Sequence, residues 1–353
     1  MGILIFHPDI RAHKTNNENH IKTEEYLSEY KVVKSFEWFL KHPFNKEIDT
    51  MYLNWYENTL KDKSDFIQKI QYFIKKMIIY FVKIRGIKIY YAFHNKTPHN
   101  MKKDSEMYQK TVKPFMKFCL KKADKVVILS RKSEEYIKEE FPDVDADYFY
   151  LPHGIYTTYF YDKTRLKKRF QIKDGPLFVC LGQISPYKNT DIAVKAFIRS
   201  GVKGTLLIAG KGKEEYIKEL QNLGEENIII YPEFISDEEY SGMMQFADAA
   251  VLPYEPTSMN SGVMINAFSN GTTVIGTKTE MMEEYPEELV YGYSYGSEEE
   301  HIEALSDAMK KAEKDYGQLK EKGNLLKGQV LRDNNWETVK SIIRGEFYEG
   351  KNQ

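Results

Sequence analysis

Residues 251–276 read VLPYEPTSMNSGVMINAFSNGTTVIG, and this stretch decides how the chain is interpreted. An apolar strand predicted over 249–252 leads into a polar loop over 253–260, and Ser261 then begins a helical run. A second apolar strand follows over 273–276, so the stretch is predicted to form one βαβ unit. The free amides of a helix N-terminus attract phosphate, which makes the loop a candidate phosphate site. The alternative is an ordinary capped helix.

The same alternation of strands and helices runs through the whole chain. It predicts an α/β fold with two Rossmann-like doubly wound domains that face a cleft. We expect one domain over 1–160 and a second over 161–334, with residues 335–353 forming a last helix that crosses back to the first domain. Ligands of parallel sheets bind at the carboxyl ends of the strands, so the loops at those ends are where chemistry is expected.

Charge is distributed unevenly along the chain, although the formal net charge is only −1. Between Lys61 and Lys125 there are 17 Lys and Arg residues against 5 Asp and Glu residues. The near-neutral total does not indicate a nucleic-acid binder. The basic helices predicted within 60–85 and 102–125 suit an anionic lipid surface, so we expect peripheral membrane association through them.

The first of these basic helices also carries an apolar stripe. A stripe at helical spacing predicts the side of a helix that packs against the protein core. Its members are Phe66, Ile70, Phe73, Met77, Phe81 and Ile84, widened by Ile67, Ile74 and Ile78.

Several classes of protein are not supported by the sequence. Cys119 and Cys180 have apolar neighbours and no metal-ligand spacing, so both are expected to be buried free thiols. The histidines also lack such spacing, and we predict no metal and no cofactor. No signal peptide and no membrane-spanning apolar run are visible, so a cytoplasmic protein is expected, peripheral at most at the inner face of the membrane.

A second informative stretch is GQISPYKN over 182–189, which follows a predicted strand and precedes a predicted helix. Gly182 allows a ligand to approach the backbone closely. Lys188 lies where a helix begins, a position that disfavours a cation unless an anion is also bound. A phosphate would satisfy both features, and the alternative is a solvated surface lysine. The stretch is not a P-loop, because GxxxxGK[ST] is absent.

With these motifs, the C-terminal half resembles the family 4 type of retaining glycosyltransferases, which have the GT-B fold. The similarity lies in LFVCLGQISPYKN, LLIAGKG and LPYEPTSMNSGVMINAFSNGTTVIG. In that family the second domain binds a nucleotide-diphosphate sugar, the first binds the acceptor, and a basic residue matched by Lys188 holds the diphosphate. Ser258 and Asn266 stand where the family signature has two glutamates, so the chain resembles a divergent branch.

The resemblance implies roles for individual residues. The expected catalytic residues are His94, Glu255 and Lys188. The expected donor-binding residues are Gly182, Gln183, Lys188, Ser258, Asn260, Ser261, Gly262, Val263 and Asn266. The expected acceptor-binding residues are Asn54, Trp55 and His153. Asn266 can hydrogen-bond ribose in place of a glutamate. Glu255 either takes the place of the missing sugar-binding carboxylate or is simply a solvated acid of the loop. For His94, the alternative to a catalytic role is a capping or core histidine.

The activity implied by the resemblance is that of a metal-independent retaining glycosyltransferase. It would move a sugar from a nucleotide-diphosphate sugar, UDP rather than GDP, to a glycan or lipid-linked acceptor in bacterial surface polysaccharide synthesis. Lys188 and the amides of the helix N-terminus would stabilise the leaving diphosphate. Two alternatives stay open: another GT-B enzyme such as a nucleotide-sugar epimerase, and a catalytically silent nucleotide-sugar-binding partner of a transferase.

Overall fold

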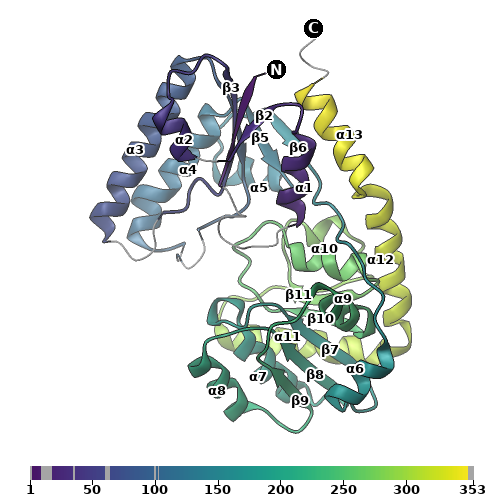
Figure 1. The fold of residues 1–353 in the computed structure, drawn as a ribbon. Helices are drawn as coiled ribbons and strands as arrows, with labels where there is room; N and C mark the ends of the chain where they lie inside the picture. Colours follow the sequence, from purple (N-terminus) through teal and green to yellow (C-terminus); the bar gives the residue numbers. More distant parts are fainter. Residues whose placement is uncertain are drawn as a thin grey trace. The chain divides into compact units, whose positions relative to one another are not determined.

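The structure is a computed structural model of the chain, and it describes residues 2–8, 18–34, 36–59, 64–98, 101 and 103–348. The chain divides into two compact units, whose elements are labelled in Figure 1. Unit 1 consists of Met1–His153, Thr257–Asn260 and Trp336–Gln353. Unit 2 consists of Gly154–Pro256 and Ser261–Asn335. The short segment Thr257–Asn260 was not predicted to leave the second domain, and it falls inside the stretch with which the sequence was first interpreted.

The described part of unit 1 contains a parallel sheet of six strands in the order β2-β1-β3-β4-β5-β6. The strands are β1 (Ile3–His7), β2 (Lys31–Val33), β3 (Ile48–Asn54), β4 (Lys88–Ala92), β5 (Lys125–Ile128) and β6 (Tyr148–Tyr150). The strand order reverses between β1 and β3, and ligand crevices in such sheets form beside that reversal, at the carboxyl ends of the strands. In unit 1 those ends are His7 and Asn54.

Helices cover both faces of this sheet, because its strands are apolar on both sides. One face packs against α2 (Phe36–Lys41), α3 (Asp65–Ile84), α4 (Lys113–Lys122) and α5 (Lys132–Glu140). The other face packs against α1 (Glu18–Tyr26) and the last helix, α13 (Trp336–Phe347). Figure 1 shows α1 and α13 on the side of the sheet opposite α3.

A π-helical turn lies directly before Pro114. The segment η2 (Tyr108–Val112) is π-helical and continues directly into α4, which has Pro114 in its first turn. Proline has no amide hydrogen to donate to the carbonyl of Lys110, so the turn before it widens and the helix continues without breaking.

The side of α3 that packs on the core is not the predicted one. Tyr72, Ile79 and Val82 are its buried residues, and Lys75 points the same way, its Nζ donating to the carbonyl of Tyr56 at 2.7 Å. Most of the predicted stripe is exposed: Phe66, Ile67, Ile70, Phe73, Ile74, Met77 and Ile84. The prediction was wrong because periodicity identifies an apolar side of a helix without showing what covers it.

The described part of unit 2 also forms a six-stranded parallel sheet, in the order β12-β11-β10-β7-β8-β9. The strands are β7 (Leu177–Leu181), β8 (Thr205–Ala209), β9 (Ile228–Tyr231), β10 (Ala249–Leu252), β11 (Thr273–Thr277) and β12 (Tyr291–Tyr293). The sequence reading did not identify β12. The order reverses between β7 and β10, so the loops after these two strands flank the expected ligand crevice.

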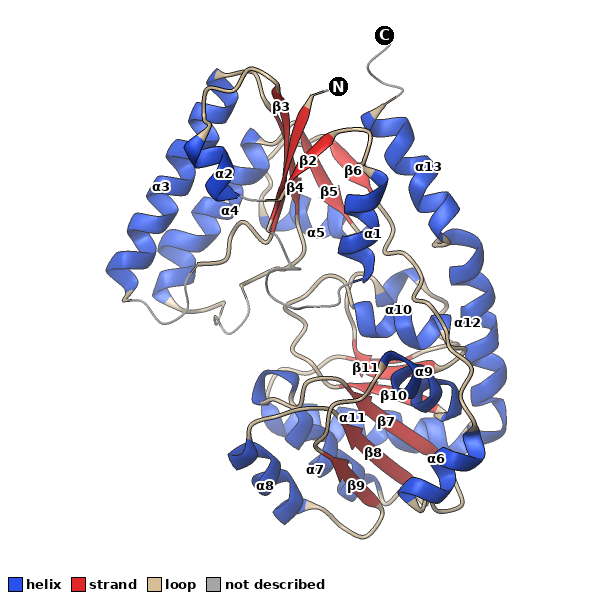
Figure 2. Cartoon of the chain, viewed as in Figure 1, coloured by secondary structure: helices blue, strands red, loops and turns tan. Residues whose placement is uncertain are grey.

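The helices of unit 2 lie on both faces of its sheet (Figure 2). One face packs against α7 (Thr190–Ser200), α8 (Glu214–Leu223) and α11 (Glu298–Lys314). The other is contacted by α9 (Asp237–Phe246), α10 (Gly262–Ser269) and α12 (Leu319–Asp333), and α6 (Lys163–Phe170) packs on α9. The prediction of two doubly wound α/β domains is therefore confirmed. Cys119 and Cys180 are both free and buried, as predicted.

Truncating Phe347 tests whether α13 is an integral part of unit 1. The ring is 2% exposed and contacts the rings of Tyr30, Tyr52, Tyr90 and Phe149. We expect Phe347→Ala to lower the free energy of unfolding by about 3–5 kcal/mol, the usual cost of removing a core aromatic ring. Phe160→Ala is the control, because Phe160 is 96% exposed and its truncation should cost less than about 0.5 kcal/mol. Equal urea midpoints for the two variants would contradict this packing.

Candidate functional site

The Lys188 ammonium is the most distinctive charge of unit 2. Lys188 ends a one-turn 3-10 helix, η3 (Pro186–Lys188), in the loop after β7. Its Nζ lies 5.1 Å from the centroid of the Tyr254 ring, and no carboxylate of the described residues pairs with it. Desolvation lowers the pKa of Lys188 from its usual value. A partly desolvated cation without a counter-ion is costly, so a bound anion would stabilise this arrangement.

Two glycines near the Lys188 ammonium stand where a side chain would clash with neighbouring atoms. Gly182 has φ +106°, and a Cβ there would lie 3.3 Å from Lys188 Nζ. Gly210 has φ +142°, and a Cβ there would lie 1.8 Å from the carbonyl oxygen of Gly182. Both backbone conformations favour glycine, and both side-chain positions are already occupied. Gly210 is therefore required for the close packing of its strand end against Gly182.

The loop after β10 is fastened to the loop after β7. Asn189 adopts a left-handed conformation, with φ +51°, and its Nδ2 donates to the carbonyl of Pro253 at 3.0 Å. Thr277 Oγ1 donates to the carbonyl of Tyr254 at 2.8 Å. These bonds hold both loops together at the reversal of strand order.

The loop after β10 leads into a helix N-terminus. Ser261 is the N-cap of α10, and its Oγ accepts from the amide of Met264 at 3.2 Å. The amides of Gly262 and Val263 lie in the first turn, where a helix provides no internal acceptor. Together with Lys188, unit 2 thus carries an ammonium and the positive end of a helix dipole on the two loops that flank its crevice.

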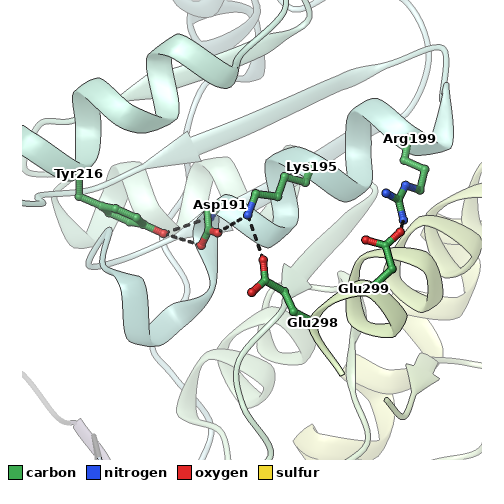
Figure 3. Close-up of polar contacts among 6 residues, drawn as sticks. All are labelled: Asp191, Lys195, Arg199, Tyr216, Glu298 and Glu299. Carbon is green, nitrogen blue, oxygen red and sulfur yellow. Dashed lines mark hydrogen bonds and ion pairs between the residues drawn. The ribbon is translucent and has the colours of Figure 1, made fainter. Parts of the chain in front are cut away.

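A charged network braces α7, the helix that begins directly after Lys188 and Asn189. Figure 3 shows Asp191 between the hydroxyl of Tyr216, at 2.9 Å, and the ammonium of Lys195, at 3.0 Å. The ammonium of Lys195 also pairs with Glu298 at 3.2 Å, and Arg199 pairs with Glu299 at 2.6 Å. Since these partners lie on α8 and α11, the network fixes the first turns of α7 against its neighbours.

The remaining residues of unit 2 that were predicted to bind or act on the donor are less clearly prepared for that role. Asn270 Nδ2 donates to Asn266 Oδ1 at 2.8 Å, so the side-chain oxygen of Asn266 is used within α10 and its amide group is left as a donor. Gln183 and Glu255 are exposed. Burial first and the charge of Glu255 second raise the pKa of Tyr295 to about 12, which places Glu255 near that ring.

Two predicted donor residues lie in unit 1, beside His94. The segment Thr257–Asn260 runs antiparallel to the end of β4, with a bridge between Asn95 and Ser258. The carbonyl of His94 accepts from the amide of Met259 at 3.1 Å. Asn260 Nδ2 reaches the same carbonyl at 3.4 Å, and the Ser258 hydroxyl donates to the Asn260 carbonyl at 2.6 Å. The structure therefore groups Ser258 and Asn260 with His94 and assigns Ser261 onward to unit 2.

His94 is fixed from the opposite side by Asn54 and Trp55. Its Nε2 lies 2.9 Å from Asn54 Oδ1, and its ring stacks on the Trp55 ring at a centroid distance of 4.5 Å. His20 stacks on Trp55 at 5.7 Å. Trp55 has φ +48°, a conformation that a bulky residue adopts only when its surroundings enforce it. Asn54, Trp55 and His94, predicted separately, thus form one assembly at the carboxyl ends of β3 and β4, and His20 was not predicted.

Two charged residues, Glu57 and Lys75, support the loop that carries Trp55 through separate hydrogen bonds. Glu57 is 1% exposed, and its Oε2 accepts from the hydroxyl of Tyr91 at 3.1 Å. Lys75 Nζ donates to the carbonyls of Tyr56 and Asn58, at 2.7 and 2.5 Å. Burial raises the pKa of Glu57 to about 6 and lowers the pKa of Lys75 to about 8. Sequence reading missed this pair because its members are eighteen positions apart and follow no motif.

His153, the third predicted acceptor residue, is buried at the end of unit 1 and is not without an interaction partner. No cluster of three or more metal-binding side chains occurs among the described residues. The expectation of no metal therefore stays a prediction.

Replacing Glu57 tests the buried pair through the pH dependence of stability. Its pKa is raised from 4.5 to about 6, so between these values the native protein holds a proton that the unfolded chain has released. The free energy of unfolding therefore falls as pH rises from about 4.5 to about 6. The total decrease is about 2 kcal/mol, because each pKa unit corresponds to about 1.36 kcal/mol. Glu57→Gln removes the effect. The unfolding free energy of the variant, relative to the original protein, should therefore rise by about 2 kcal/mol between pH about 4.5 and 6.5.

Tyr91→Phe is the matched variant for this prediction. It removes the hydrogen bond that lowers the pKa of Glu57, so the pH window should extend to higher pH. A free-energy difference between Glu57→Gln and the original protein that stays constant with pH would show that Glu57 has an ordinary pKa.

Comparison with known proteins identifies the type of domain that carries Lys188. Residues 162–325 match the family model of glycosyl transferases group 1. This range contains Lys188, both crevice loops and α10. No curated protein sequence matches the chain.

Solved structures resemble the chain over its full length. Sucrose-phosphate synthase from Thermosynechococcus elongatus is 15% identical with a TM-score of 0.69, covering 100% of this chain and 99% of its own. HepE from Anabaena in complex with UDP is 12% identical with a TM-score of 0.70, covering 99% and 100%. WaaG, a glycosyltransferase involved in lipopolysaccharide biosynthesis, is 12% identical with a TM-score of 0.61, covering 98% and 100%. These similarities confirm the expected GT-B fold.

Proposed function

We propose that this chain is a glycosyltransferase that uses a nucleotide-diphosphate sugar, because residues 162–325 match the family model of glycosyl transferases group 1. The observation that carries the proposal is the Lys188 ammonium, which has no carboxylate partner among the described residues and lies on the loop after β7, while the loop after the adjacent strand β10 leads into the N-terminus of α10. UDP is the proposed nucleotide, supported by the complexes of the similarly folded HepE with UDP and with UDP-glucose.

The proposed reaction is transfer with retention of configuration at the anomeric carbon. The bond between that carbon and the diphosphate oxygen breaks, and an acceptor hydroxyl forms the new bond on the same face of the sugar. Lys188 and the amides of Gly262 and Val263 stabilise the negative charge of the leaving diphosphate. Since this charge stabilisation comes from the chain itself, we propose that the transfer is metal-independent.

Roles for the other predicted residues belong to the same proposal. His94 and Glu255 act at the sugar, while Gly182 lets the diphosphate approach the backbone and Gln183, Ser258, Asn260 and Asn266 complete the donor set. Asn54, Trp55 and His153 contact the acceptor. The stacked rings of Trp55 and His94 support this assignment, because sugars bind flat aromatic faces together with a few polar groups.

We propose a glycan or lipid-linked sugar as the acceptor, in bacterial surface polysaccharide synthesis at the cytoplasmic side of the membrane. The resemblance supports this assignment, and so do the basic residues of 60–85 and 102–125. Residues 60–63 and 102 of these ranges lie outside the described part of the chain. None of the described helices is long and apolar enough to cross a membrane.

A catalytically silent nucleotide-sugar-binding protein is the second candidate. The specific observation in its favour is that the two residues in place of the signature glutamates are already bonded. Ser258 donates to Asn260, and the Asn266 oxygen accepts from Asn270. Incubation with UDP-sugars separates the candidates, because a transferase releases UDP slowly by hydrolysis even without acceptor, whereas the silent protein binds the donor without any turnover.

Lys188→Ala tests the diphosphate site. Loss of charge-assisted hydrogen bonds to phosphate should weaken UDP binding about 10- to 100-fold in calorimetric titration, while uridine binding changes less than about twofold. Lys211→Ala is the matched control, since Lys211 is also a lysine at a strand end of unit 2 and lies over the exposed Phe234 ring. The assignment fails if Lys188→Ala weakens UDP and uridine equally, or if Lys211→Ala has the larger effect on UDP.

A further inference from the structure

The outward side of α3 is an apolar surface that the proposed chemistry does not use. We define the outer face of α3 as Phe66, Ile70, Phe73, Met77, Tyr80 and Ile84. These positions alternate between spacings of four and three, so the side chains form one line that extends about 27 Å at 1.5 Å per residue. Their exposed fractions range from 41% for Ile70 to 84% for Ile84.

This surface is not an incompletely packed part of the core. The inner side of α3 already fills the core with Tyr72, Ile79 and Val82. Beside this helix, Phe44 is 76% exposed, and its ring contacts that of Phe81 of α3 at a centroid distance of 5.7 Å. Contiguous exposed apolar patches of this kind mark surfaces that meet a partner or a membrane.

The border of the outer face is positively charged. Asp65 is the only acidic residue of α3, whereas Lys69, Lys76 and Lys83 recur every seven positions along one edge. Lys76 Nζ lies 5.6 Å from the centroid of the Phe118 ring, and Lys122 Nζ lies 5.5 Å from that of Tyr80. Apolar side chains bordered by lysines are the composition of helices that lie in the interface of an anionic bilayer.

The lysines of α4 are less suited to such a surface. Lys113 pairs with Glu140, and Lys117 and Lys121 pair with Asp143 at 2.6 and 2.7 Å. Carboxylates of unit 1 thus offset the positive charge that the sequence shows within 102–125. Of the two basic helices, α3 combines cations with exposed apolar side chains.

We propose that unit 1 binds the surface of an anionic lipid bilayer through the outer face of α3. The apolar side chains enter the boundary between headgroups and acyl chains, and Lys69 and Lys76 contact lipid phosphates. Lys83 pairs with Asp124 at 2.7 Å, but no described carboxylate pairs with Lys69 or Lys76. These two unpaired cations favour lipid over a second copy of the chain, whose own lysines would be repelled. The inference sharpens the membrane association proposed above and does not depend on catalytic activity.

Vesicle flotation of the full chain tests the proposal. We expect binding to mixed phosphatidylcholine–phosphatidylglycerol vesicles and little binding to pure phosphatidylcholine. The double variant Phe73→Gln, Met77→Gln should bind about tenfold or more weakly, from the loss of buried apolar area. Lys69→Gln and Lys76→Gln should each weaken binding about fivefold, the effect of one basic residue at an anionic surface.

Two controls make the result specific. Phe160→Gln alters a ring of unit 2 that is more exposed than Phe73, and Lys117→Gln with Lys121→Gln alters the paired lysines of α4. Both variants should bind vesicles like the original chain. UDP binding should be unchanged in every variant, which separates a failure here from a failure of the proposed function. Unaltered vesicle binding by Phe73→Gln, Met77→Gln would overturn the proposal. So would a concentration-dependent dimer, in ultracentrifugation, that this variant abolishes without any vesicle binding.

Discussion

The placement of one ammonium group, that of Lys188, underlies the organisation of unit 2. It lies against the Tyr254 ring and has no carboxylate partner among the described residues, which is unfavourable for a lone folded chain. Much of the local structure serves to hold it there. Gly182 and Gly210 remove side chains that would displace it, Asn189 ties its loop to the loop after β10, and the Asp191 network fixes the following helix. A bound diphosphate would supply the missing counter-ion, so the unfavourable free energy of the unpaired ammonium in the free protein would favour binding.

The loop after β10 belongs to both units. Its residues Thr257–Asn260 are bonded to the end of β4 beside His94, and Ser261 immediately caps α10 in unit 2. Asn260, a member of the proposed donor set, and Ser261, the N-cap of α10, are therefore adjacent in the chain although they belong to different units. This continuity explains why one stretch of sequence contained candidates for both parts of the chemistry.

Most of the fold could be predicted, because a parallel α/β sheet gives strong local signals. The strand β10 (Ala249–Leu252) was predicted to the residue, and β11 (Thr273–Thr277) to within one residue. Gly182 and Lys188 could be found from their place between a predicted strand and a predicted helix. Long-range pairing could not be predicted: nothing local shows that Ser258 lies beside Asn95, that Glu57 meets Tyr91, or that Asn266 is bonded by Asn270. The apolar stripe of α3 was recognised but assigned to the core, because a sequence shows hydrophobicity and not what covers it.

The central claim is that the Lys188 ammonium and the N-terminus of α10 together hold a nucleotide diphosphate. A crystal structure of the chain with UDP tests it most directly. The account predicts phosphate oxygens within hydrogen-bond distance of Lys188 Nζ and of the amides of Gly262 or Val263. Clear density for UDP elsewhere, or a bound diphosphate that contacts neither group, would contradict it.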